Sequence, residues 1–265
     1  MNFIDIASWQ KGIDLDAMFR KHPDLDGVIV KASGGTGYVN PDFKGWADTI
    51  LAEGKMLGVY HFLDDGCGKT SGAKEAEHFV KTITPYIGRC VPFVDWEADA
   101  LKYGAKYPKD FMWKVYELTG VKCGIYLSHG RISSEFSTMT DCPLWVARYA
   151  DDCKVKAFVE KPFGDSDNVS PWEKPTLRQY TANGYLDGWS GRLDFNKFYG
   201  TREDWNRMAG APCAAETQQE EPDAAEEAAA EPEEMTENAA KALILNTISM
   251  LEELVRVLKK RIGEE

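Results

Sequence analysis

Short apolar runs alternate with amphipathic stretches over residues 2–200, and this alternation constrains the fold more than any other feature of the chain. The pattern is typical of β-strands joined by helices. Strands are predicted at Asn2–Ile6, Gly27–Ala32, Leu57–Phe62, Val91–Glu97, Cys123–Ser128, Leu144–Arg148, Thr176–Tyr180 and Leu193–Phe195. Helices are predicted at Asp14–Lys21, Pro41–Glu53, Ser71–Thr82 and Lys109–Thr119, with only loops between the later strands. Eight strands in one domain favour an α/β fold, a modified β/α barrel of about five β/α units plus three β-strands.

Two carboxylates end the fourth predicted strand, Val91-Pro-Phe-Val-Asp-Trp-Glu97. Successive side chains of a strand point to opposite faces, so Asp95 and Glu97 share a face and lie roughly 6–7 Å apart. Two acids in one space shift each other's pKa and can both reach one sugar ring, as a glycosidase requires. The Asp-x-Glu motif alone is weak evidence for a glycosidase. In about half of such triplets one acid is solvated in a loop at the end of a strand and the other caps a helix.

Two further acids lie on predicted strands. Asp5 nearly ends the first strand, and Asp194 lies in the last one. In barrels of this class the chemistry takes place at the carboxyl ends of the strands. We therefore expect an acidic site at that end of the barrel.

The net charge of -12 is unevenly distributed. Residues 211–238 carry ten acids and no base, whereas residues 1–210 carry 29 acids and 26 bases. A main domain so close to neutrality argues against a nucleic-acid partner, which needs a concentrated basic face. The six cysteines show neither zinc spacing nor a disulfide framework, so we expect no metal and no cofactor.

The composition changes abruptly after Gly210 and predicts three segments: a barrel domain at 1–208, an acidic Ala/Glu/Pro linker at 209–235 and an amphipathic helix at 236–265. The helix has an apolar seam with steps of four and three residues, formed by Ile244, Ile248, Leu251, Val255, Leu258 and Ile262. Such a face predicts a homo-oligomer. The alternative is that the helix folds back on the barrel.

Eight segments of the chain, in order, resemble the glycoside hydrolase family 25 lysozymes, of the phage endolysin or bacterial autolysin type. They are Asp5-Ile-Ala-Ser-Trp-Gln10, Val30-Lys-Ala-Ser33, Gly58-Val-Tyr-His-Phe62, Val94-Asp-Trp-Glu97, Gly124-Ile-Tyr-Leu-Ser128, Leu144-Trp-Val-Ala147, Leu177-Arg-Gln-Tyr180 and Gly191-Arg-Leu-Asp194. The resemblance covers about residues 1–205. It implies a lysozyme-type barrel that cleaves the β-1,4 bond between N-acetylmuramic acid and N-acetylglucosamine in peptidoglycan.

By the same resemblance, each acid has an expected role. Glu97 matches the general acid/base and Asp95 the carboxylate beside it, while Asp5 and Asp194 complete the catalytic acids. The expected substrate-binding residues are Tyr60, Tyr126 and Gln179. Asp95 either attacks the sugar or orients the acetamido group of the substrate as the nucleophile; the resemblance of the family's Asp-x-Glu pair to that of other N-acetylhexosamine hydrolases favours the second route.

The chain departs from the family pattern at Ala7, Gly34 and Arg178, where the family often has Ser, Glu and Trp. None of these departures touches the four acids. Two histidines near the motifs have simpler interpretations: His61 is expected to be a hydrogen-bonded packing residue, and His129 to lie in a loop with only a small chance of reaching the cleft.

The start of the chain has no basic segment followed by an apolar core, and no stretch is long enough to cross a membrane. We therefore expect cytoplasmic synthesis without a signal peptide and no membrane partner. The resemblance to endolysins implies action on the cell wall after phage-mediated release. Two alternatives are a non-catalytic peptidoglycan-binding barrel with a helical oligomerisation module, and a scaffold protein whose helix pairs with a partner.

Overall fold

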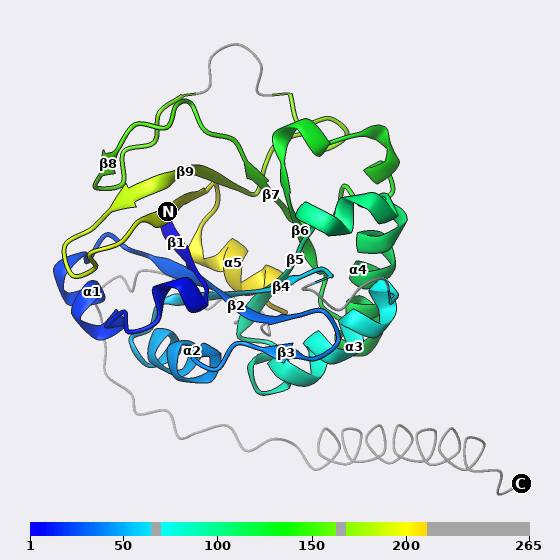
Figure 1. Cartoon of the computed structure of the whole chain (residues 1–265), viewed down its shortest axis with the longest axis horizontal. Helices are drawn as coiled ribbons and strands as arrows, with labels where there is room; N and C mark the ends of the chain where they lie inside the picture. Colours follow the sequence, from blue (N-terminus) through cyan, green and yellow to red (C-terminus); the bar gives the residue numbers. More distant parts are fainter. Residues whose placement is uncertain (65–69, 163–167, 211–265) are drawn as a thin grey trace, which may run out of the picture. The chain divides into compact units, whose positions relative to one another are not determined.

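The computed structural model describes residues 1–64, 70–162 and 168–210. Its centre is a closed ring of strands in the order β1-β10-β9-β7-β6-β5-β4-β2, completed by pairing of β2 with β1 (Figure 1). The eight strands of the ring are β1 (Asn2–Ile6), β2 (Gly27–Gly34), β4 (Met56–Phe62), β5 (Cys90–Asp95), β6 (Gly124–Ser128), β7 (Leu144–Ala147), β9 (Leu177–Tyr185) and β10 (Leu193–Phe198). The predicted eight-strand barrel is confirmed.

The first seven strands of the ring run parallel, and β10 is antiparallel to both of its neighbours, β1 and β9. Two short strands lie outside the ring: β3 (Tyr38–Val39) pairs with β2, and β8 (Val155–Lys156) pairs with β9. Because β10 runs in the opposite direction, its amino-terminal end lies beside the carboxyl ends of the other strands.

Among the described residues, the helices α1 to α4 lie around the outside of the ring (Figure 1). They are α1 (Leu15–Lys21), α2 (Phe43–Ala52), α3 (Gly72–Ile83) and α4 (Lys106–Thr119). Asp14 caps α1 by accepting a hydrogen bond from the Ala17 amide, and Ser71 caps α3 in the same way. Helix α4 begins three residues before its predicted start at Lys109, because Pro108 lies in its first turn. At that position the backbone N–H that proline lacks would have no partner within the helix.

The described residues before β7 also form 3-10 helices of one or two turns. They are η1 (Ser8–Gln10), η2 (Thr84–Tyr86), η3 (Ala98–Tyr103), η4 (His129–Arg131) and η5 (Ser134–Phe136). Between β6 and β7 the helical segments are only η4 and η5, so the expected fifth β/α unit lacks an α-helix. In the described residues, no α-helix lies between β6 and α5 (Arg202–Met208).

The sequence prediction ended the last two strands too early. The dipeptide Asn183-Gly184 is a turn signal, yet it lies within β9. Gly184 is required there for space, because a Cβ at this position would come within 2.6 Å of the Phe195 ring. Tertiary packing therefore overrides the local turn preference.

Helix α5 was not predicted. Thr201 and Asp204 form a capping box at its start, a signal that can be read from the sequence. Its Trp205 side chain is buried against Phe3 and Phe198, and its indole N–H donates to the Leu57 carbonyl oxygen. The helix thus closes the end of the barrel at which the parallel strands begin.

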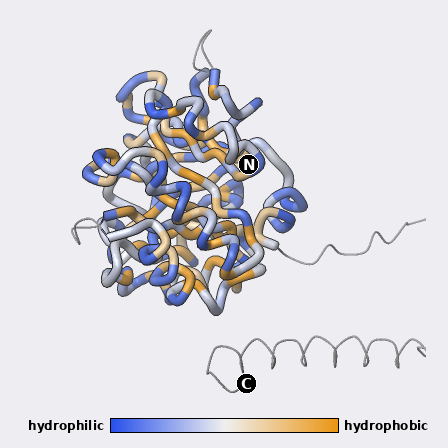
Figure 2. Tube along the Cα trace, turned by 90° about the vertical axis from the view of Figure 1, so that its right-hand side faces the viewer, coloured by the Kyte–Doolittle hydropathy of each residue, from blue (hydrophilic) through white to orange (hydrophobic). Residues whose placement is uncertain are grey.

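The barrel interior changes from apolar to polar along the strands. Phe3 precedes Asp5 on β1, and Phe93 precedes Asp95 on β5, each pair on the inward face. Apolar side chains fill the closed end, and polar side chains gather at the open end. The hydrophobic segments lie mostly inside the domain and the hydrophilic ones outside (Figure 2).

None of the described helices is long and apolar enough to cross a lipid bilayer. The predicted linker beyond Gly210 and the predicted helix at 236–265 lie outside the described residues, so their prediction is untested.

Candidate active site

The four predicted acids line one cavity of about 340 Å³ at the open end of the barrel. Asp5 and Asp95 come from β1 and β5, and Glu97 follows β5 in extended backbone. Asp194 is the second residue of β10 and lies directly opposite Asp5 in the antiparallel pair. The reversed direction of β10 therefore brings an acid from the far end of the domain sequence into the site.

The three predicted substrate-binding residues line the same cavity. They are Tyr60 on β4, Tyr126 on β6 and Gln179 on β9. All seven side chains expected from the sequence are thus brought together. The structure shows their positions and contacts, and their roles in a reaction remain predictions.

Asp5 is held by two amide groups. Its Oδ2 accepts hydrogen bonds from Gln179 Nε2 at 2.9 Å and from Asn196 Nδ2 at 2.7 Å. The indole N–H of Trp145, which can only donate, points at Asn196 Oδ1 at 2.8 Å. This donor fixes the Asn196 amide, so that its NH₂ group must face Asp5.

Gln179 is oriented in the same way by two phenols. Tyr126 and Tyr149 both donate to its Oε1, at 3.0 and 2.6 Å. The Gln179 NH₂ group is thereby directed at Asp5. A chain of hydrogen bonds from three aromatic side chains therefore fixes one carboxyl group of the site.

Burial raises the pKa of three acids in the cavity, Asp5, Asp194 and Glu97. The pKa of Asp5 is raised by burial and by the charge of Asp194 beside it. The pKa of Asp194 is raised from 3.8 to about 6 by burial, with Glu97 adding to the shift. The pKa of Glu97 is also raised by burial, and the Lys31 ammonium opposes this shift. A carboxyl group with a raised pKa can hold a proton at weakly acidic pH and donate it.

Asp95 lies buried among phenols. Burial and then the charge of Asp95 raise the pKa of both Tyr60 and Tyr126, so the two phenols stay protonated and can donate hydrogen bonds.

Four further side chains of the site were not assigned to it in the sequence analysis. They are Trp9, Lys31, Tyr149 and Asn196. Lys31 could have been found from strand parity, because it is on the same face of β2 as Ile29, which is buried in the barrel. Its ammonium lies 4.6 Å from the centre of the Phe62 ring, a cation–π contact.

Trp9 lies in the one-turn helix η1 and Tyr149 in a loop, and neither segment is long enough for periodicity to mark a buried face. The Trp9 side chain is 88% exposed although it lines the cavity. A flat aromatic surface beside a polar cavity is suited to stacking on a sugar ring.

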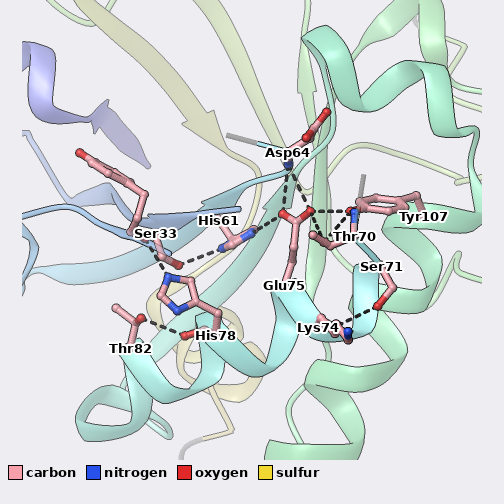
Figure 3. A network of polar contacts seen from close by, with 11 residues as sticks. Ser33, His61, Asp64, Thr70, Ser71, Lys74, Glu75, His78, Thr82 and Tyr107 are labelled. Atoms are coloured by element: carbon pink, nitrogen blue, oxygen red, sulfur yellow. Dashed lines mark hydrogen bonds and ion pairs between the residues drawn. The ribbon is translucent and has the colours of Figure 1, made fainter. Parts of the chain in front are cut away.

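His61 is a packing residue with hydrogen bonds, as predicted. It is fully buried on the outer face of β4, where Nδ1 lies 2.9 Å from Ser33 Oγ and Nε2 lies 2.9 Å from Glu75 Oε2 (Figure 3). His129 does not line the acidic cavity; its Nε2 lies 2.9 Å from the Asn168 carbonyl oxygen. His129 therefore does not reach the acidic cavity.

The described portion of the chain holds no evident metal site, and its cysteines are free thiols. No group of three or more His, Cys, Asp or Glu side chains in it is arranged to hold a metal ion. Cys90, Cys123, Cys142 and Cys153 are free thiols, and Cys67 and Cys213 lie outside the described residues.

Comparisons of sequence and of fold both find lysozymes among the similar proteins. The family described as glycosyl hydrolases family 25 matches residues 4–189. The autolytic lysozyme of Clostridium acetobutylicum is 27% identical over 205 residues, which are 75% of this chain and 56% of that protein. The chain thus spans little more than half the length of this relative.

Two solved structures are similar in fold. The bacterial lysozyme of Streptomyces coelicolor has a TM-score of 0.63 at 23% identity, over 79% of this chain and 96% of that one. The CTP1L endolysin has a TM-score of 0.56 at 24% identity, over 79% of this chain and 69% of that one.

Proposed function

The chain belongs to glycosyl hydrolase family 25, and we propose that it is a peptidoglycan hydrolase, an N-acetylmuramidase that cleaves the β-1,4 bond between N-acetylmuramic acid and N-acetylglucosamine. The observation that carries this proposal is the gathering of Asp5, Asp95, Glu97 and Asp194 in one cavity. The name of the clostridial autolytic lysozyme supports the same reaction.

Glu97 is proposed as the general acid. Cleavage of a glycosidic bond requires a proton on the leaving oxygen, and the raised pKa of Glu97 keeps a proton available at weakly acidic pH. After the leaving group departs, the same carboxylate can accept a proton from the attacking water.

Asp5 and Asp194 are proposed to keep the site acidic and to hold the sugar. Tyr60, Tyr126 and Gln179 are proposed to bind the substrate, because each presents a polar group to the cavity. The exposed Trp9 ring offers a stacking surface at the same opening.

The proposal is tested by digestion of purified peptidoglycan and mass analysis of the fragments. New reducing ends on N-acetylmuramic acid support it, and reducing ends on N-acetylglucosamine alone contradict it. Glu97→Gln should lower turnover on the order of 10²–10⁴-fold without unfolding, because the amide keeps the shape but cannot donate the proton. A folded variant that keeps more than about a tenth of the activity would exclude Glu97 as the acid.

Asp95 has two possible roles, which a second experiment separates. Asp95→Asn should lower activity strongly whether Asp95 attacks the sugar or orients the acetamido group. We favour the orienting role, for which a thiazoline analogue of N-acetylhexosamine should inhibit the enzyme. Detection of a glycosyl adduct on Asp95 by mass spectrometry would establish direct attack instead.

The finer organisation of the chain is also a proposal. We propose a catalytic domain at 1–208, a linker at 209–235 and an oligomerising helix at 236–265, the last two supported by sequence composition alone. Release of the enzyme to the wall by a phage is supported by the similarity in fold to the CTP1L endolysin.

A further inference from the structure

Asp5 and Asp194 form a pair of acids at the open end of the barrel, and their contact requires a proton. The two residues lie opposite each other on β1 and β10, Asp5 is buried, and the Asp194 side chain has a hydrogen bond with Asp5. Ionised carboxyl groups only accept hydrogen bonds, so one member of a hydrogen-bonded pair must hold a proton. The surrounding side chains decide which member holds it and on which oxygen.

The Oδ2 atom of Asp5 is fully used as an acceptor. Gln179 Nε2 donates to it at 2.9 Å, and Asn196 Nδ2 donates to it at 2.7 Å. Two N–H groups that point at one carboxyl oxygen occupy its two lone pairs and leave no place for a proton on it. A proton on Asp5 therefore lies on Oδ1, the oxygen that remains for Asp194.

The Asn196 amide cannot turn over, because Trp145 holds its other end. Trp145 Nε1 lies 2.8 Å from Asn196 Oδ1, and an indole N–H can only donate. A reversed amide would place its NH₂ group against the indole N–H and its oxygen against Asp5 Oδ2. Asn196 and Trp145 are both buried, so the two lost hydrogen bonds would not be replaced by water.

Asp194 is the member of the pair that carries the charge. Burial raises the pKa of Asp194 to about 6, and the hydrogen bond with Asp5 partly offsets this rise, as expected for a carboxylate that accepts it. Burial and the charge of Asp194 raise the pKa of Asp5. Above about pH 6 the pair thus consists of a neutral Asp5 and an ionised Asp194.

Six further titratable side chains line the same cavity. Burial raises the pKa of Glu97, so this acid keeps a proton in weakly acidic solution. Burial also raises the pKa of the three tyrosines, which stay neutral. Near pH 6 the site can therefore hold a protonated Glu97 together with an ionised Asp194. The six side chains are Lys31 on β2, Tyr60 on β4, Asp95 on β5, Glu97 after β5, Tyr126 on β6 and Tyr149 after β7.

We propose that Asn196, anchored by Trp145, is a positioning residue that holds the proton of the acidic pair on Asp5 Oδ1 and so leaves the negative charge on Asp194. This inference rests on the proposed function. Cleavage of a glycosidic bond develops positive charge on the sugar ring in the transition state. A carboxylate at a fixed place in the cavity stabilises that charge, and a neutral Asp5 avoids a second buried anion beside it.

Carbon-13 NMR of the aspartate carboxyl groups in the full chain tests the position of the proton without any substrate. The signals of the two acids are assigned by their loss in Asp5→Asn and in Asp194→Asn. At pH 7 Asp5 should be protonated and Asp194 ionised. A proton on Asp194, on both acids or on neither would overturn the inference. Because the titration uses the unaltered protein, it does not depend on the folding of any further variant.

Trp145→Phe tests the role of the Asn196 amide, because it removes the N–H that fixes the orientation of this amide. The released amide can turn its oxygen toward Asp5 Oδ2, and the proton can then leave Oδ1. The pKa of Asp194 should rise by about half to one pH unit, as expected for loss of one hydrogen bond. The acid limb of kcat on soluble glycan fragments should move to higher pH by the same amount, with little change in KM.

Trp205→Phe is the matched control. Trp205 is also buried, and its indole N–H also makes one hydrogen bond, to the Leu57 carbonyl oxygen at the closed end of the barrel. This variant should lower the melting temperature but leave the pKa of Asp194 and the acid limb of kcat unchanged. Equal shifts in the two variants, or no shift in Trp145→Phe, would overturn the role of Asn196. If the unaltered protein cleaves no glycan, the proposed function fails, whereas the NMR titration still decides where the proton lies.

Discussion

Asp5 and Asp194 face each other across an antiparallel strand pair inside the open end of the barrel, and this arrangement has an energetic cost. Burial favours the neutral form of both carboxyl groups; the charge of Asp194 raises the pKa of Asp5 further, whereas a hydrogen bond with Asp5 partly offsets the rise in the pKa of Asp194. The pair therefore retains a proton at a pH where free aspartates have lost theirs. Proton retention suits a site that donates protons, but it destabilises the fold at higher pH.

Asp194→Asn should consequently stabilise the protein above about pH 6 and have little effect near pH 4. In the folded chain the pKa of Asp194 is raised from its ordinary value of 3.8 to about 6. The wild-type protein therefore loses stability as the pH rises between these two values. The gain should be on the order of 1 kcal/mol or more. Thermal unfolding across pH measures it, with Asp99→Asn on an exposed side chain as the control. A stability difference that does not vary with pH would contradict the shifted pKa.

Strand parity was enough to predict which acids share a face. It placed Asp95 and Glu97 together, and the family motifs added Tyr60 and Gln179. Asn196 could not be found in this way, because its importance depends on Trp145, which is distant in sequence and orients the amide from another strand.

At the scale of elements, the end of β4 is fixed from behind by the carboxylate of Glu75 on α3 (Figure 3). Its Oε2 accepts hydrogen bonds from His61 Nε2 at 2.9 Å and from the Asp64 amide at 3.0 Å. Its Oε1 accepts from the Tyr107 hydroxyl at 2.6 Å. Since Tyr60 on the inner face of β4 lines the acidic cavity, this network connects two helices to the geometry of the site.

Glu75→Ala should lower the free energy of unfolding by about 3 kcal/mol, because buried donors lose their acceptor. Glu75→Gln should cost clearly less. Its amide oxygen can accept from His61 and the Asp64 amide, while its NH₂ group can donate to the Tyr107 oxygen. Urea denaturation of both variants measures the difference. Equal losses would show that the charge of Glu75, and not its acceptor geometry, stabilises the end of β4.

At the scale of the molecule, the order of strands and helices was predictable because the apolar runs are well separated, whereas the closure of the barrel was not visible in any one segment. Helix α5 illustrates the limit. Its capping box can be read from Thr201 and Asp204, but only the folded ring provides the apolar end that Trp205 fills. Local signals therefore predict elements, and their mutual packing decides which short ones persist.

The last prediction concerns residues 236–262, which lie outside the described residues. Six seam residues at heptad spacing, flanked by Leu243, Met250, Leu254 and Val257, offer more apolar surface than a two-stranded seam needs, so we expect an assembly of three or more chains. Several barrels held together would bind a polymeric wall with an apparent affinity raised by about 10²–10⁴-fold if they engage at once. Light scattering of the full chain beside a version ending at Gly210 measures the assembly. If both are monomeric at micromolar concentration, the apolar face serves another purpose, such as docking on its own barrel.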